Sequence, residues 1–227
     1  MIKITLQKII FFIAFIIFAI YILLPQKEHF SNLTISQVEK DYPQSSFISV
    51  GDKYKQKYNN EYCFLYGELT FDGMQSLCNK AKELNLPTNM LIDLGCGNGR
   101  ALFYAILAGF DNAKGVELAE ERIEYGKNVL KDKDDDTKNR INIELKDIFE
   151  LDKSYFGGCK VIYISNLVFP ENTNQKLFDF LKDKIEKGTV IFSSSTPANM
   201  SGYTFLGSIR APMSWEKQSE LFISKFD

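Results

Sequence analysis

The residues with the clearest chemistry lie in the segment LIDLGCGNGR, residues 91–100. Asp93 ends an apolar run, and three glycines follow it at alternate positions (Gly95, Gly97 and Gly99) before a helical pattern begins. Glycine lets the chain turn sharply from strand to helix and lets a ligand approach the backbone, and N–H groups at the helix start can hold an anionic group. A dinucleotide fingerprint has its third glycine at position 100, where Arg100 stands. The loop therefore fits a nicotinamide dinucleotide poorly.

Two further acids occupy equivalent places after later strands. Glu117 ends the run in GVEL, and Asp147 follows the next run in ELKDIF. One carboxylate can accept from two hydroxyl donors at once, as a ribose presents them. Three acids at three successive strand ends indicate one shared site.

The loop and the acids resemble the first motifs of class I S-adenosylmethionine (SAM) methyltransferases, which makes SAM the expected cofactor. The resemblance implies that Asp93 and the loop hold the methionine part, that Glu117 and Leu118 bind the ribose, and that Asp147 and Ile148 bind the adenine. The implied loop residues are Gly95, Cys96, Gly97 and Gly99.

Composition excludes several other kinds of site. The chain has 227 residues and one histidine, His29, so it cannot form a Ser-His-Asp triad or a multi-histidine metal site. Its four cysteines are scattered without ligand spacing, and we expect neither a metal nor a disulfide framework. With 27 basic against 29 acidic residues, the chain lacks the basic footprint of strong nucleic-acid binding.

Strand-like and helix-like patterns alternate along the chain, which is typical of a parallel α/β sheet. We expect strands at residues 90–93, 114–118, 141–145, 161–164 and 189–193, and helices at residues 100–107, 120–130 and 174–185. The charge run KDKDDDTKNR, residues 131–140, is expected to be a solvated loop.

An apolar leader precedes this pattern. Residues 9–24, IIFFIAFIIFAIYILL, span about 24 Å as a helix, and Ile4 and Leu6 extend them toward the width of a bilayer. A signal peptide is the rival interpretation, but no A-x-A cleavage site follows. We therefore expect a transmembrane anchor at residues 1–24, a polar stalk at 25–60 and a methyltransferase domain at 61–227. Lys3 and Lys8 weakly favour a cytosolic N-terminus, whereas a cytosolic supply of SAM favours a cytosol-facing domain.

Three further segments carry a closer resemblance: YGELTFD at residues 66–72, VIYISNLVF at 161–169 and MSW at 213–215. With the SAM motifs, they resemble the Dot-one type (disruptor of telomeric silencing) lysine methyltransferases over residues 61–216. The resemblance implies a Rossmann-like class I methyltransferase sheet, mostly parallel and seven-stranded, with helices on both faces and here preceded by one transmembrane helix. It implies that Tyr66, Glu68 and Thr70 close over the cofactor. It further implies catalytic roles for Tyr66, Ser165 and Asn166, and a lysine channel lined by Phe169 and Trp215.

The sequence departs from the family pattern at three places. Ser165 stands where the family has the first of two asparagines, Leu221 and Phe222 lie nearest to its late tyrosine pair, and its nucleosome-binding basic segment has no counterpart. We therefore expect a membrane-anchored protein-lysine N-methyltransferase whose partner is a protein with an accessible lysine, histones included. The alternatives are methylation of a lipid or small molecule at the membrane, and a non-catalytic module.

Overall fold

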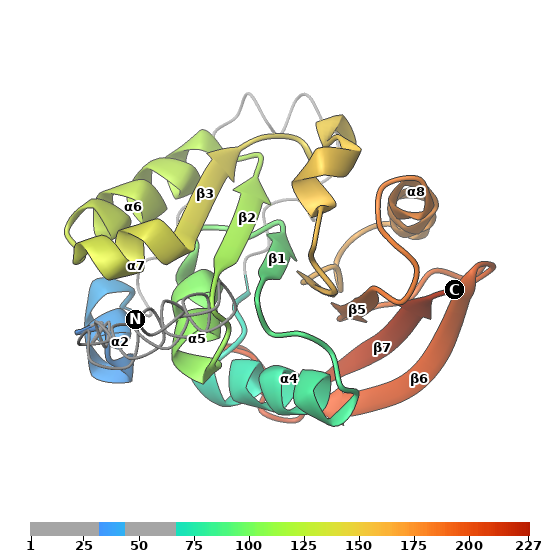
Figure 1. Ribbon diagram of the computed structural model, residues 1–227, viewed down its shortest axis with the longest axis horizontal. Coiled ribbons are helices and arrows are strands. Elements are labelled where there is room, and N and C mark those ends of the chain that lie inside the picture. The colour runs from blue at the N-terminus through green and yellow to red at the C-terminus, as the bar shows by residue number, and fades with distance from the viewer. Residues whose placement is uncertain (1–31, 44–66) are drawn as a thin grey trace, which may run out of the picture. The chain divides into compact units, whose positions relative to one another are not determined.

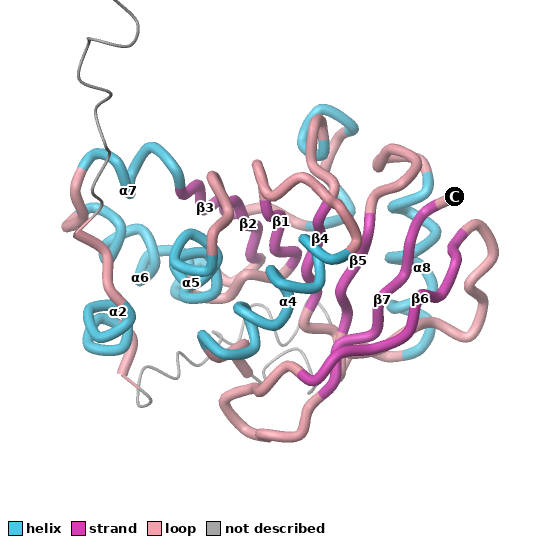
Figure 2. The backbone as a smooth tube through the Cα atoms, turned by 60° about the horizontal axis from the view of Figure 1, so that its bottom comes forward, coloured by secondary structure: helices cyan, strands magenta, loops and turns pink. Residues whose placement is uncertain are grey.

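The computed structural model describes residues 32–43 and 67–227, and its centre is a seven-stranded sheet in the order β3-β2-β1-β4-β5-β7-β6. Neighbouring strands from β3 to β5 run parallel, β7 pairs antiparallel with β5, and β6 closes the edge antiparallel to β7. Figure 2 follows the sheet from β3 to β6. The predicted seven-stranded, mostly parallel sheet is confirmed.

From β1 to β5 the strands are separated by helical segments, as the sequence pattern predicts, and β6 and β7 then follow with no helix between them (Figure 1). The strands are β1 (Leu91–Leu94), β2 (Ala113–Glu117), β3 (Ile141–Leu145), β4 (Val161–Ile164), β5 (Val190–Ser193), β6 (Tyr203–Arg210) and β7 (Glu220–Phe226). The helices are α2 (Ile35–Asp41), α4 (Phe71–Glu83), α5 (Arg100–Ala108), α6 (Glu120–Lys131), α7 (Asp135–Arg140) and α8 (Glu171–Lys182), with short 3₁₀ turns η2 (Ile148–Glu150) and η3 (Lys153–Phe156).

The central strands are buried throughout because helices cover both faces of the sheet. All four residues of β1, β4 and β5 are buried. Neighbouring residues face opposite sides, so Leu91 packs in the core with α4, α5 and α6, whereas Ile92 packs in the core with α8. Helices on both faces were predicted, and the structure agrees.

Two local predictions need correction. The charge run at residues 131–140 contains helix α7 and is not a continuous loop, because the Asp134 carboxylate caps it by accepting from the Thr137 N–H at 2.8 Å. Helix α8 begins at Glu171, before the predicted residue 174, because the chain turns into the helix directly after Pro170.

The described part of the expected stalk, residues 32–43, packs against the domain. Asn32 to Asp227 form one compact unit. The Thr34 hydroxyl caps α2, and both Val38 in the helix and Tyr42 directly after it are fully buried. These residues therefore belong to the folded domain and are not a free stalk.

The β6 edge of the sheet is irregular. Its pairing with β7 shifts register between Phe205 and Gly207, and Gly207 has a φ of 108°. Phe205 is 56% exposed.

Among the residues that the structure describes, no helix has the length and apolar character needed to cross a bilayer. The predicted anchor, residues 1–24, lies outside the described residues.

Candidate active site

The predicted site residues gather at one edge of the sheet, where the five parallel strands end. Asp93 lies in β1, Glu117 ends β2, Asp147 follows β3 and Ser165 follows β4. Strand order reverses direction between β1 and β4, and ligands of open α/β sheets bind at such a crevice. The topology thus brings these four residues to a single edge.

The glycine loop has the backbone that its sequence requires. Gly95, Gly97 and Gly99 have φ values of 92°, 57° and 84°, a region that other residues rarely adopt. A Cβ at Gly95 would meet no atom of the described residues within 4 Å, so among them this side of the loop is open to a ligand. The Cys96 side chain instead points inward and packs against Gly115, where an added Cβ would lie 2.5 Å from the Cys96 Cβ. Burial raises the pKa of the Cys96 thiol well above its ordinary value. Cys96 can therefore contribute only its backbone.

Asp93 is a buried acid with an unused oxygen. Its side chain is 2% exposed, and Oδ1 has no hydrogen-bond partner within the described part of the chain. Burial raises the pKa of this carboxyl well above its ordinary range, and the nearby Glu117 carboxylate raises it further. Such an acid is costly to keep in the absence of a ligand, and a cationic group at the site would favour its charged form.

The Glu117 carboxylate holds the loop together. Oε2 accepts from the Gly97 N–H at 2.9 Å, and Oε1 accepts from the N–H groups of Leu118 and Ala119 at 2.8 and 2.9 Å. Arg122 Nη1 lies 3.8 Å from Oε2. A carboxylate offers about four acceptor positions, so three are occupied by backbone amides and little capacity is left for hydroxyl groups. Glu117 thus shapes the loop in addition to its predicted role at the ribose.

Asp147 and Ile148 lie at the start of η2, after β3. The Asp147 carboxylate accepts from the Phe149 N–H at 2.9 Å, which caps the turn. Ile148 and Phe149 are partly buried against the core that contains α8. The pair therefore combines a carboxylate with an apolar surface, the combination that the predicted adenine site needs.

The YGE segment lies against the glycine loop. Tyr66 is outside the described residues. Glu68 Oε2 accepts from Arg100 Nη1 at 2.8 Å, and both side chains are more than four-fifths buried. The Thr70 hydroxyl caps α4 by accepting from the Gly73 N–H, and it donates to the Pro212 carbonyl at 2.8 Å. Thr70 therefore has a structural role in this arrangement, whereas Glu68 joins its segment to the residue that follows the loop.

The YGE and MSW segments pair with each other although they are 146 residues apart. The Glu68 N–H donates to Ser214 Oγ at 3.1 Å, the Ser214 N–H donates to the Glu68 carbonyl at 2.8 Å, and Leu69 forms an antiparallel bridge with Met213. This pairing places Trp215 against Gly67.

Asn166 is fully engaged in holding two loops. Its Nδ2 donates to Asn174 Oδ1 at 2.8 Å and to the Ser195 carbonyl at 2.9 Å, while its Oδ1 accepts from the Ser195 N–H at 3.0 Å. Both donors of the amide are used, so Asn166 positions the loop after β5 and does not project a free group. Ser165 is partly exposed and lies directly after β4.

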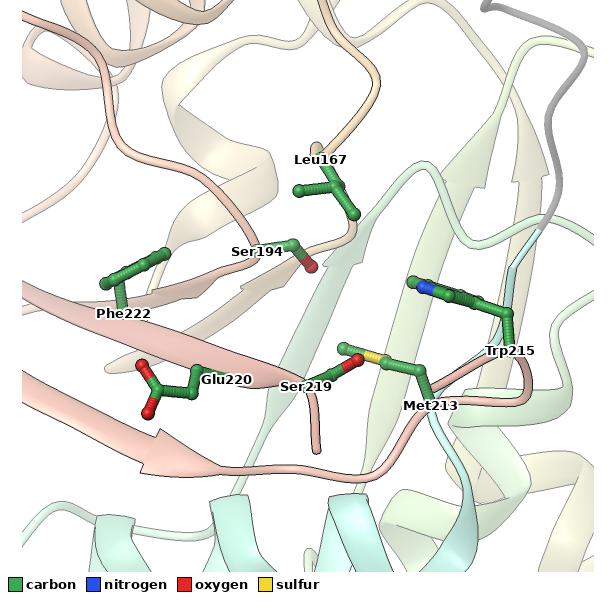
Figure 3. Close-up of a pocket in the computed structure, with 7 residues that line it drawn as sticks. All are labelled: Leu167, Ser194, Met213, Trp215, Ser219, Glu220 and Phe222. Atoms are coloured by element: carbon green, nitrogen blue, oxygen red, sulfur yellow. The ribbon is translucent and has the colours of Figure 1, made fainter. Parts of the chain in front are cut away.

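A cavity of about 210 Å³ adjoins these segments (Figure 3). Of the two residues predicted to line a lysine channel, Trp215 is among those that line this cavity, whereas Phe169 packs against the core that contains α8. Leu167 points into the cavity instead and is 55% exposed. Figure 3 shows Ser194 Oγ directed between Leu167 and Met213. The lining residues are Leu167, Ser194, Met213, Trp215, Ser219, Glu220 and Phe222.

The loop residues fit SAM. Asp93 offers an unused buried carboxyl oxygen to the ammonium group of the methionine part, and the space beside Gly95 admits a ligand. Two more acids follow at the next strand ends.

A family model described as histone methylation protein DOT1 matches residues 45–204, more than half of the chain. The chain belongs to the DOT1 family. It is a class I methyltransferase, and its cofactor is SAM.

This DOT1-family chain is similar to solved structures of other methyltransferases. The glycopeptide N-methyltransferase MtfA is 13% identical, with a TM-score of 0.50 over 69% of this chain and 97% of that chain. An RNA methyltransferase from Salinibacter ruber, in complex with S-adenosyl-L-homocysteine, is 17% identical, with a TM-score of 0.49 over 66% of this chain and 88% of that chain. Likeness at this level of identity concerns the fold alone. None of the curated proteins matches the chain.

Sequence reasoning missed most of the cavity of this DOT1-family domain. Leu167, Ser194, Met213 and Phe222 come from three separate segments, and no spacing between them marks a site. The sequence did point to Phe222, because this residue lies nearest to the position of the family's late tyrosine pair. Ser194 had none, since a serine at a strand end is common.

Proposed function

We propose that this chain is a membrane-anchored protein-lysine N-methyltransferase. The observation that carries the proposal is the cavity beside the cofactor loop, whose apolar walls are formed by Leu167, Met213, Trp215 and Phe222. Walls of this kind suit the methylene chain of lysine, and an apolar site lowers the pKa of an entering amine and so favours the free base. Membership of the DOT1 family supports a protein substrate.

The residues of the cavity supply orientation and exclude water. Bound SAM would supply an electrophilic methyl group: the amine lone pair would form the new N–C bond as the C–S bond breaks, the electron pair of that bond would stay on sulfur, and the methylated nitrogen would release its proton to water. Catalysis then depends on holding the amine in line and in a dry site.

We assign the orientation of the amine to Ser194. Ser194 is 7% exposed and lines the cavity, and its buried hydroxyl has no hydrogen-bond partner among the described residues and is directed between Leu167 and Met213. A neutral hydroxyl can accept an N–H from the amine and leave the nitrogen lone pair free. Both donors of the Asn166 amide are already engaged, so we give Ser194 the orienting role that the sequence assigned to Asn166.

The test is transfer of labelled methyl groups from SAM by the full-length protein to histones, membrane proteins and extracted lipids. We expect label in protein lysine. Ser194→Ala should lower kcat about tenfold with the Kd for SAM unchanged, the cost of one hydrogen bond in the transition state. Ser219→Ala is the matched control, because that serine also lines the cavity but its hydroxyl already donates to the Glu216 carbonyl at 3.1 Å.

A second candidate function is methylation of a lipid or small molecule. The exposed apolar side chains at the cavity, Leu167 at 55% and Trp215 at 45%, favour an apolar substrate. Label that partitions into the organic extract would support this function and overturn lysine methylation. If the protein binds SAM but methylates none of these substrates, that result would contradict both functions and support a non-catalytic module.

The membrane anchor is proposed from the sequence of residues 9–24. We place the domain on the cytosolic side, where SAM is made, and an anchor there would raise the local concentration of membrane-associated substrates. Cell fractionation with protease protection tests both points: a domain that proteases cannot reach in intact organelles or vesicles would contradict the cytosolic orientation.

A further inference from the structure

Helix α2 contacts the cofactor loop from outside the region that defines the family. Its residues, Ile35–Asp41, precede the family match, which begins at residue 45. Tyr42, the residue after the helix, is fully buried, and its hydroxyl donates to the backbone carbonyl of Asn98 at 3.1 Å. Asn98 lies between Gly97 and Gly99, so this hydrogen bond acts on the centre of the glycine loop.

Helix α6 also lies close to the Asn98 carbonyl. A Cβ added to Gly126 of α6 would lie 2.2 Å from the Asn98 oxygen, so α6 approaches the loop as closely as a glycine permits. The Asn98 side chain contributes too, because Oδ1 accepts from the Arg100 N–H at 3.2 Å, at the start of α5. Movement of this one peptide would therefore shift both the loop and the first turn of α5.

Helix α2 is in turn fastened to α6 and to the segment after it. The Asp41 carbonyl accepts from the Tyr125 hydroxyl at 2.6 Å, and the Asp41 carboxylate forms an ion pair with Lys133. The Tyr42 ring lies 5.6 Å from the rings of both Phe103 and Tyr125. The Tyr42 hydroxyl is therefore presented to the loop by a docked helix and not by a loose segment.

We propose that α2 sets the conformation of the cofactor loop through the Tyr42 hydroxyl, so that docking of α2 and binding of SAM favour each other. Tyr42 is a positioning residue: it fixes the Asn98 peptide and with it the neighbouring amides that surround the cofactor. Because linkage is reciprocal, anything that displaces α2 lowers the affinity for SAM by the same factor by which SAM stabilises the docked helix. The part of this inference that concerns affinity rests on SAM as the cofactor.

The test compares Tyr42→Phe with Tyr125→Phe in the full-length protein. Each variant keeps its aromatic ring and loses one hydrogen bond made by a tyrosine hydroxyl. Tyr42→Phe loses the bond to Asn98 in the loop, whereas Tyr125→Phe loses the bond to Asp41 in α2. We expect Tyr42→Phe to raise the Kd and the KM for SAM by about threefold to tenfold, the worth of one hydrogen bond, with kcat unchanged. Tyr125→Phe keeps the bond to the loop and loosens α2 only where it meets α6, so its Kd for SAM should rise less than that of Tyr42→Phe.

Hydrogen exchange without SAM gives a readout that does not depend on the cofactor. Amides of residues 97–100 should exchange faster in Tyr42→Phe than in Tyr125→Phe. Equal exchange and equal SAM affinity in the two variants would overturn the inference. A difference in exchange in a protein that binds no SAM would support the coupling of α2 to the loop and contradict SAM as the cofactor.

Discussion

The two halves of the site are built differently. The cofactor half lies in one continuous loop and two strand ends, and its shape is fixed by backbone groups: three glycines with positive φ and three amides bound to Glu117. The cavity half is assembled from side chains of the segments after β4, after β5 and before β7, and of β7 itself. A site made of backbone leaves a motif in the sequence, whereas a site made of side chains from distant segments does not.

The strongest test of the backbone half is Gly95→Arg. We expect the affinity for SAM to fall at least about 100-fold, because the side chain would fill the open space beside the loop and the left-handed φ would add strain of about 1–2 kcal/mol. Gly188→Arg is the matched control, since Gly188 has a φ of 82° and equally open surroundings away from the site. Calorimetry measures both. Equal SAM binding by the two variants would contradict the assignment of the loop.

Asn166→Ala tests whether Asn166, beside the cavity half, stabilises the fold and takes no part in catalysis. The three hydrogen bonds of Asn166 are buried, so we expect the free energy of unfolding to fall by about 3 kcal/mol in denaturant titrations. Asn172→Ala, on the exposed face of α8, should change it by less than about 0.5 kcal/mol. A stable Asn166→Ala protein that binds SAM but has no turnover would return Asn166 to the catalytic role predicted from the sequence.

Asp93→Asn separates stability from cofactor binding. Burial raises the pKa of Asp93 when the protein is folded, so its contribution to stability is present below the ordinary carboxyl pKa and is lost as the pH rises through the raised value. At neutral pH the variant without SAM should therefore be more stable, by about 1 kcal/mol, and should bind SAM about tenfold more weakly. The affinity of the unchanged protein for SAM should fall as the pH is lowered, and that dependence should be weaker in the variant. Thermal melts and calorimetry across pH measure both effects, and a less stable variant would contradict the raised pKa.

The smallest expected effect is that of Trp215→Ala. We expect the KM for the methyl acceptor to rise about fivefold with the Kd for SAM unchanged, because Trp215 lines the cavity and is only 45% exposed. Phe205→Ala removes a more exposed ring from the β6 edge and should leave both constants unchanged. If Trp215→Ala weakens SAM binding instead, the two halves of the site are not separable at this residue.

The fold was largely predictable because alternating apolar runs report the strands and helices directly. The five parallel strands and Asp93, Glu117 and Asp147 all follow from such runs. The helix α7 was missed because its stability comes from the Asp134 cap and not from an apolar face. The role of Asn166 and the inward turn of Phe169 were also not predictable, since both depend on tertiary partners such as Asn174 and the core that contains α8.

The irregular β6 edge has a consequence for association between molecules. An edge strand presents unpaired N–H and C=O groups to which another chain could add a strand. Here the register shift at Gly207 bends the strand, and a charged side chain, Arg210, stands near its end. A second copy would therefore find no straight row of partners along β6, so the open edge resists growth of the sheet into aggregates.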